Sequence, residues 1–291
     1  MVETAKETNT QTSVKSEEKF DVEGYFKRIG FSGERSATLE TLKQIHKFHP
    51  QAIPFENLNP FLRIPVSLDI HDLYRKLVLS KRGGYCFEHN LLLMEVLRAL
   101  GFKVKGLAAR VLWNQPQGAI TARGHMLLLV SIGSVDYITD VGFGGMTLTA
   151  PLQLKVDEQQ QTPHEDFKIT PLGSDYVLQA KVQGDWRMIY SFSLQENFQI
   201  DYEVTSWYLS NFPSSHFITG VIAALAFDGG RYALRNTDFS VHYLDGRHER
   251  KSVQSVDTLI ELLTNTFRID VPVTPDADKL FAQIVQNGAK K

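Results

Sequence analysis

The chain lacks the features that would place it outside the cell, in a membrane or on nucleic acid. It has a single cysteine among 291 residues, so no internal disulfide can form and no oxidising compartment is required. The longest apolar run, residues 221–227, is far shorter than the roughly 18 residues that a membrane helix needs. The net charge is −2 with no long basic run, which argues against nucleic acid or an anionic membrane as the main partner. We therefore expect a cytoplasmic protein.

The composition and length indicate a globular protein built from more than one unit. Hydrophobic residues make up 43% of the chain and charged residues 22%, and 291 residues exceed what one small core can organise. We expect a disordered tail over 1–19, a helical bundle over 20–105, a β-barrel over 106–205 and an α/β unit over 206–291.

Local patterns predict the elements of each unit. One helix is expected to begin at Asp21, and a second is expected to begin near Thr38 and to end near Pro50. Further helices are expected over 69–79, 86–100 and 256–267, and Thr274-Pro275 should open a last one. The expected strands lie at 103–113, 124–132, 135–141, 175–182, 186–192, 232–234 and 239–243. Residues 53–58 are too short and proline-broken for an element, and 155–166 are expected to form a surface loop.

The only cysteine, Cys86, follows Gly83-Gly84 and precedes a strongly helical pattern. Phe87, Leu91 and later apolar residues recur at steps of three and four, so Cys86 is expected in the first turn of a helix. The unpaired N–H groups of a helix start favour an anion, which would promote the thiolate and could hold an oxyanion. The competing interpretation is a buried cysteine that acts as a small apolar residue.

A cysteine nucleophile needs a base and an acceptor that orients the base. His125 begins an apolar strand, and Asp140 ends the next strand after the short turn at Gly133-Ser134. The two strands would pair antiparallel, with both side chains at the same open end. His125 is thus the candidate base and Asp140 its candidate acceptor.

Other histidines compete for these roles. His89 lies one helical turn after Cys86 and is the main rival base, although nothing evident orients its second nitrogen. His46 and His49 have the spacing of a helical metal pair, but no third ligand is evident, so we expect surface or packing residues and no metal site.

Two further segments carry candidate residues. Glu56 and Arg82 are expected to form an ion pair across the fold. Residues 141–145 contain three glycines but match neither a dinucleotide fingerprint nor a phosphate loop. We expect a tight loop that leaves Phe143 over the thiol and offers backbone N–H groups to a ligand; a simple turn after a strand is the alternative.

These segments together resemble the arylamine N-acetyltransferases. The matching pieces are residues 53–58, 82–90, the His125 strand and 140–144, in the order of that family, with His125 39 residues after Cys86 and Asp140 15 residues after His125. The resemblance runs from about Phe20 to about Val271 and does not cover the tail.

The resemblance implies an α+β, papain-like cysteine-enzyme fold with an N-terminal helical bundle, a central β-barrel and a C-terminal α/β lid. It implies a Cys86-His125-Asp140 triad, acetyl-CoA as co-substrate with no permanently bound cofactor, and an arylamine or arylhydrazine as acceptor in xenobiotic metabolism. It assigns Phe143 to the acceptor pocket, implies a structural role for Glu56 and Arg82, and makes His89 unlikely to be essential. More loosely, it assigns substrate or CoA contacts to Trp113, Gly124, Gly144 and Tyr208.

Three alternatives remain at the level of the sequence. A cysteine hydrolase or transglutaminase-like enzyme could use the same triad without CoA. An amide synthase that closes a macrolactam would need a substrate bound to a carrier protein. A catalytically silent binding module would not need the Cys86, His125 and Asp140 set.

Overall fold

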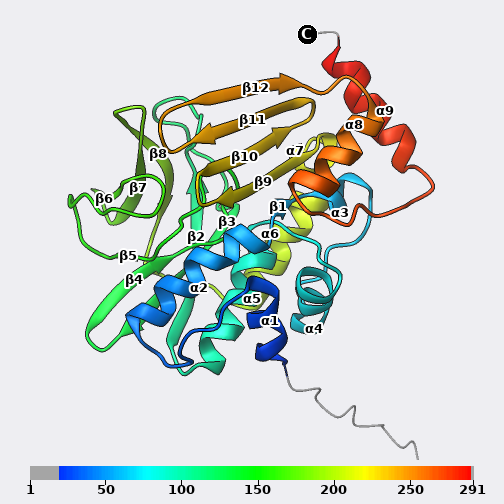
Figure 1. The fold of residues 1–291 in the computed structure, drawn as a ribbon. Helices are drawn as coiled ribbons and strands as arrows, with labels where there is room; N and C mark the ends of the chain where they lie inside the picture. Colours follow the sequence, from blue (N-terminus) through cyan, green and yellow to red (C-terminus); the bar gives the residue numbers. More distant parts are fainter. Residues whose placement is uncertain (1–19, 290–291) are drawn as a thin grey trace, which may run out of the picture.

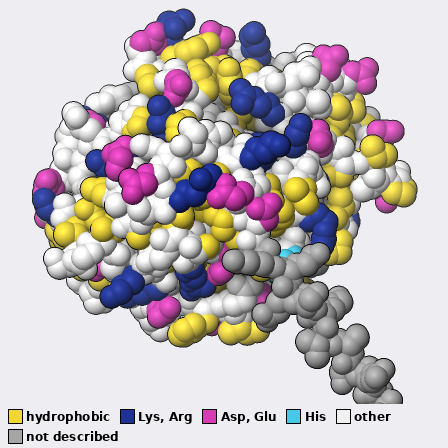
Figure 2. Space-filling model, turned by 60° about the horizontal axis from the view of Figure 1, so that its bottom comes forward, with side chains coloured by type: hydrophobic (Ala, Val, Ile, Leu, Met, Phe, Trp, Pro, Cys, Tyr) yellow, Lys and Arg dark blue, Asp and Glu magenta, His cyan; other side chains and the backbone are white. Residues whose placement is uncertain are grey.

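The structure, a computed structural model, describes residues 20–289 and combines helices with two antiparallel sheets (Figure 1). The predicted tail, residues 1–19, lies outside the described residues. On the face shown in Figure 2, basic and acidic side chains are interspersed where the grey atoms do not cover the surface, as the near-neutral net charge leads one to expect.

The N-terminal part is helical, and its buried core also includes side chains from later in the chain, such as Met126, Leu128 and Tyr202. Its helices are α1 (Val22–Ile29), α2 (Leu39–Ala52), α3 (Leu58–Phe61), α4 (Ile70–Tyr74), the π-helical segment η1 (Arg75–Leu79) and α5 (Cys86–Ala99). Asp21 caps α1 by accepting a hydrogen bond from the N–H of Gly24 at 3.0 Å, and Thr38 caps α2 through the N–H of Thr41 at 3.3 Å. Helix α2 ends at Ala52, two residues after Pro50 and therefore near the predicted end. Pro50 lacks an N–H, but the N–H of Ile53 donates to the carbonyl of His49 at 2.9 Å and completes the last turn.

The central part is a seven-stranded antiparallel sheet that is nearly closed, in the order β5-β4-β3-β2-β8-β7-β6. Its strands are β2 (Lys103–Val111), β3 (His125–Ile132), β4 (Val135–Thr139), β5 (Leu152–Gln153), β6 (Phe167–Leu172), β7 (Asp175–Val182) and β8 (Asp185–Phe192). The predicted strands at 175–182 and 186–192 form a hairpin, in which Gln183 and Gly184 both have positive φ, as suits a two-residue turn. The segment 155–166 forms no helix or strand but makes single bridges to β6 at Val156 and Gln160.

The C-terminal part contains a five-stranded antiparallel sheet with helices packed on it. The sheet order is β1 (Phe55–Glu56), β9 (Ile222–Phe227), β10 (Gly230–Arg235), β11 (Asp238–Tyr243) and β12 (His248–Ser252). The expectation that residues 53–58 form no element is wrong. Phe55 and Glu56 pair with Ala224 and Ala223, so the partner strand supplies the hydrogen bonds that make so short a strand stable.

The remaining helices connect and cover the sheets. They are α6 (Gln199–Asn211), α7 (His216–Thr219), α8 (Val256–Glu261), the π-helical segment η2 (Leu262–Thr266) and α9 (Ala277–Gly288). Helix α6 has no counterpart among the predicted elements. The predicted start of the last helix at Thr274-Pro275 is wrong by two residues: the backbone carbonyl of Thr274, not its side chain, accepts from the N–H of Ala277 at 3.1 Å.

Candidate active site

Cys86 is the first residue of α5 and lies against the loop that follows β4. Only 4% of its surface is exposed, and its Sγ lies 3.8 Å from the carbonyl oxygen of Gly124. Gly142 packs so closely that a Cβ at this position would stand 2.8 Å from the Cα of Cys86. Real Cβ atoms do not come so close, so glycine is required where the loop meets the start of the helix.

His125 and Asp140 lie side by side at one end of the barrel, as the antiparallel pairing predicts. The register pairs Leu128 with Thr139, which brings the start of β3 next to the end of β4. The Nε2 of His125 lies 2.7 Å from Oδ2 of Asp140, and both side chains are almost fully buried. Burial alone would lower the pKa of His125, but the Asp140 carboxylate and the interaction with the Cys86 side chain together raise it to about 10.

Asp140 is itself held by one neighbouring residue and by two residues from distant parts of the chain. Its Oδ1 accepts hydrogen bonds from Nδ2 of Asn90 at 3.0 Å and from the N–H of Gly142 at 2.9 Å. The backbone N–H of Asp140 donates to Nε2 of His46 at 3.2 Å. Burial would raise the pKa of the Asp140 carboxyl. His125 and the donors on Asn90 and Gly142 outweigh this effect, so the pKa is lowered.

Two aromatic rings enclose the imidazole of His125. Phe143 meets it edge-on with ring centroids 5.1 Å apart, and the buried ring of Tyr190 on β8 lies 5.0 Å away. Burial, followed by the nearby Asp140 carboxylate, raises the pKa of Tyr190, so its hydroxyl stays protonated beside the acid. These rings keep water away from the imidazole and from the carboxylate behind it.

The other predicted binding residues surround this centre at different depths. Trp113 and Phe143 are both partly buried against the core of the barrel. Gly144 has φ +89° and packs against the ring of Phe55, where a Cβ would lie at 3.3 Å. Tyr208 on α6 is 45% exposed and stacks on Phe212, with ring centroids 4.7 Å apart. The structure thus brings Phe143 to His125 and leaves Tyr208 on the surface.

Known proteins with similar sequences and structures identify the family of this chain. The N-acetyltransferase family model matches residues 38–276. An arylamine N-acetyltransferase of Mycolicibacterium smegmatis is 43% identical over 255 residues, which cover 86% of this chain and 92% of that protein. The chain belongs to the arylamine N-acetyltransferase family.

Solved structures of the arylamine N-acetyltransferase family agree with this assignment. The enzyme from M. tuberculosis superposes with a TM-score of 0.86 at 39% identity, covering 90% of this chain and 99% of the other. The structure of the Mycobacterium marinum arylamine N-acetyltransferase in complex with CoA gives a TM-score of 0.87 at 38% identity, covering 91% and 99%. The predicted α+β fold with a barrel-like sheet is therefore confirmed.

In this member of the arylamine N-acetyltransferase family, two kinds of feature are absent from the part of the chain that the structure describes. Within residues 20–289, no helix is long and apolar enough to cross a membrane. Over the same range, no group of three or more histidine, cysteine or acidic side chains could hold a metal ion.

His89, the rival base, is fully engaged elsewhere. Its Nε2 lies 3.1 Å from the carbonyl oxygens of both Pro54 and Gly84, and since these oxygens can only accept, Nε2 must carry the proton. Its Nδ1 then accepts from Nε2 of His49 at 2.8 Å, and Nδ1 of His49 accepts from the Tyr25 hydroxyl at 2.8 Å. Burial lowers the pKa of His89 to about 4, so the ring stays neutral. His49 therefore orients the second nitrogen of His89, a partner that sequence spacing alone does not indicate.

We expect a His89→Leu variant to lose about 2 kcal/mol of unfolding free energy, since the buried N–H of His49 and the carbonyl of Pro54 would lose their partner. His89→Gln should lose less, because an amide can both donate to the carbonyls and accept from His49. Urea unfolding at neutral pH measures the difference. Equal stability of the two variants would contradict the assigned hydrogen-bond chain.

The predicted pair of Glu56 and Arg82 is present and buried. Nε and Nη2 of Arg82 donate to Oε1 of Glu56 at 2.9 and 2.6 Å, and Nη2 also donates to Oδ1 of Asn59 at 2.9 Å. At the next residue, Gly83, a Cβ would stand 1.9 Å from the carbonyl oxygen of Pro54. The ion pair and this close contact fix the loop before Cys86 to the segment that carries β1.

An Arg82→Met variant is expected to lose roughly 3–5 kcal/mol of unfolding free energy, because Glu56 would remain buried without its cation. Adding Glu56→Gln should restore part of the loss by removing the stranded charge. Thermal and urea unfolding of the single and double variants would test this. A single variant that unfolds like the parent protein would show that the pair does not hold the loop.

Proposed function

We propose that this chain transfers an acetyl group from acetyl-CoA to an arylamine or arylhydrazine through an acetyl-Cys86 intermediate. The observation that carries the proposal is the 2.7 Å contact of His125 with Asp140, next to a nearly buried cysteine at the start of a helix. Membership of the arylamine N-acetyltransferase family and the likeness to a relative solved with CoA support the donor and the class of acceptor.

In the first half of the reaction, the Cys86 thiolate attacks the thioester carbonyl carbon of acetyl-CoA. His125, protonated and held by Asp140, neutralises the thiolate. The tetrahedral intermediate collapses as the C–S bond to CoA breaks, and the imidazolium can protonate the departing CoA thiolate. Backbone N–H groups at the start of α5 are suited to stabilise the oxyanion.

In the second half, the amine nitrogen attacks the acetyl carbon of acetyl-Cys86. His125, now neutral, accepts the proton that the amine loses, and the bond between the acetyl carbon and Sγ breaks. The products are the N-acetylated amine and a thiolate that is again paired with imidazolium. Phe143 beside His125 is suited to contact an aromatic acceptor, and Trp113, Gly124, Gly144 and Tyr208 are the further proposed contacts to substrate or CoA.

The proposal includes the organisation of the chain and its setting. The helical unit 20–105 supplies the nucleophile, the barrel unit 106–205 supplies His125 and Asp140, and the unit 206–291 covers them. The protein needs no resident cofactor, because acetyl-CoA is a co-substrate. A cytoplasmic location suits an enzyme whose only cysteine must stay a free thiol.

Intact-protein mass spectrometry tests the intermediate directly. Mixing the protein with acetyl-CoA should add one acetyl group, mapped to Cys86, and adding aniline should remove it and yield acetanilide. Initial rates at varied concentrations of both substrates should give parallel double-reciprocal lines, as ping-pong exchange requires. An unchanged protein mass, or intersecting lines, would overturn the mechanism.

A further inference from the structure

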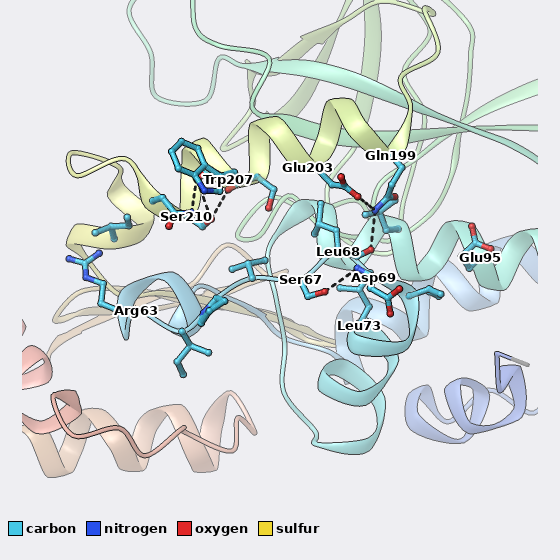
Figure 3. Close-up of a pocket in the computed structure, with 18 of the residues that line it drawn as sticks. Arg63, Ser67, Leu68, Asp69, Leu73, Glu95, Gln199, Glu203, Trp207 and Ser210 are labelled. Carbon is cyan, nitrogen blue, oxygen red and sulfur yellow. Dashed lines mark hydrogen bonds between the residues drawn. The ribbon is translucent and has the colours of Figure 1, made fainter. Parts of the chain in front are cut away.

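A large cavity in the described part of the chain lies outside the proposed active site. It has a volume of about 1040 Å³ and runs between α6 and the segment 63–73, with α5 contributing Leu91 and Glu95 (Figure 3). None of Cys86, His125 and Asp140 lines it. Leu91 and Glu95 lie five and nine residues beyond Cys86, about 7 and 13 Å further along the helix at its usual rise.

The floor of this cavity is apolar and firmly packed. It is formed by side chains that are at most 7% exposed, namely Leu68, Leu73, Leu91 and Ile218. A cavity of this size with an apolar floor fits a small organic molecule rather than a bound ion or water.

The charges on the walls are unevenly distributed. Figure 3 places Asp69, Glu95 and Glu203 in one half of the cavity and Arg63 at the opposite end. Arg98 neutralises Glu95 at 2.6 Å. Within residues 20–289, neither Asp69 nor Glu203 forms a salt bridge, so one half of the cavity carries uncompensated negative charge.

Both carboxylates are held in place by neutral donors. Asp69 accepts from the N–H groups of His71 and Asp72 at the start of α4. Glu203 accepts from Nε2 of Gln199 at 3.2 Å, and the same nitrogen donates to the carbonyl of Leu68 at 3.1 Å, so Gln199 connects the two walls. Trp207 also lines the cavity and is 67% exposed; Figure 3 places it toward the Arg63 end, away from Asp69.

We propose that this cavity is a second small-molecule site, for an amphipathic organic cation. The apolar body lies on the leucine and isoleucine floor, and the cationic head lies in the half that holds Asp69 and Glu203. A neutral molecule of the same shape gains the apolar contact alone, and an anion is opposed by the two carboxylates.

The site is separate from the proposed active site but close to it. Ser206 lines the cavity, and its Oγ is hydrogen-bonded to the hydroxyl of Tyr85, the residue before Cys86. A probe must therefore be unable to act as an acetyl acceptor. A quaternary ammonium ion has no N–H to lose and meets this condition.

Isothermal titration of the full-length protein with octyltrimethylammonium, below its micelle concentration, tests the proposal. We expect saturable binding of one cation per chain. Octan-1-ol should bind about tenfold more weakly, which corresponds to about 1.4 kcal/mol, and octyl sulfate more weakly still. Equal binding of the cation and the alcohol would overturn the proposal.

Two sets of variants locate the site. The double variant Asp69→Asn, Glu203→Gln keeps the helix cap and the contact to Gln199 and should weaken cation binding about tenfold. Glu261→Gln, an exposed substitution on α8, is the matched control and should leave binding unchanged. Ser210→Trp, which fills the cavity from α6, should abolish binding. Full binding by the double variant or by Ser210→Trp would refute the site.

Alkylation of Cys86 with iodoacetamide separates this site from the active site. Cation binding should persist after alkylation, because Cys86 does not line the cavity. Loss of binding would place the cation in the active site and refute the second site. Failure of Cys86 to form an acetyl intermediate would refute the proposed function but leave the cation site intact.

Discussion

Replacing Cys86 by serine is expected to reduce acetyl transfer from acetyl-CoA to an arylamine by roughly 10⁴-fold or more. A serine hydroxyl remains protonated at neutral pH, and His125 is arranged to stabilise a thiolate rather than to deprotonate an alcohol. The release of CoA thiol, followed by its reaction with a disulfide dye, measures the transfer rate.

The Cys86→Ser variant should fold normally, which makes its activity interpretable. The Sγ contacts the carbonyl oxygen of Gly124 at 3.8 Å, and a hydroxyl in its place is smaller. Thermal unfolding should therefore change little. The parent protein with Cys86 alkylated by iodoacetamide is the second control and should be equally inactive. A variant within tenfold of the parent rate would show that the sulfur does not carry the acetyl group.

The central parts of the site could be predicted from the sequence because each depends on a local pattern. The apolar period after Cys86 places it at a helix start, and the two-residue turn between the His125 and Asp140 strands brings both side chains to one end. The pair of Glu56 and Arg82 was also predicted, since opposite charges in two segments that the fold can bring together are natural partners.

The supporting residues could not be predicted because they depend on tertiary contacts. Asn90, His46 and Tyr190 come from α5, α2 and β8, and all three face Asp140 only once helices and barrel have packed. Asn90 lies within the nine-residue segment around Cys86, which is the only signal that could have indicated it. Helix α6 was missed because its apolar residues do not face a single core, and several of them, including Trp207, are exposed.

An Asp140→Asn variant is expected to lose roughly 10⁴-fold in kcat/KM. The carboxylate outweighs burial in raising the pKa of His125, so without it the buried imidazole should be neutral at pH 7 and no longer stabilise a thiolate. The amide of the introduced asparagine can also donate to Nε2 of His125, which would favour the tautomer that carries its proton on Nδ1. A matched Asn90→Ala variant, which removes one donor to Asp140 but no charge, should lose far less.

Iodoacetamide labelling of Cys86 reports the ion pair without any substrate. In the parent protein the pKa of His125 is raised to about 10, so the imidazole carries a positive charge at pH 7 that favours the thiolate and speeds labelling. In Asp140→Asn this charge should be lost, and labelling at pH 7 should slow about tenfold or more. Equal labelling rates for the two proteins would exclude the carboxylate as the source of the positive charge beside Cys86.

The pKa shifts of Asp140 and His125 determine how the difference in unfolding free energy between the parent protein and Asp140→Asn depends on pH. The lowered pKa of Asp140 contributes stability that is present above about pH 4 and lost as the pH falls. The raised pKa of His125 contributes stability that is complete below about pH 6.5 and lost as the pH rises towards 10. The difference in unfolding free energy between parent and Asp140→Asn should therefore be largest between about pH 4 and 6.5 and should narrow above that range. A difference that stays constant from pH 7 to pH 9 would mean that His125 is neutral in the folded parent, and the thiolate would then lack its counter-charge.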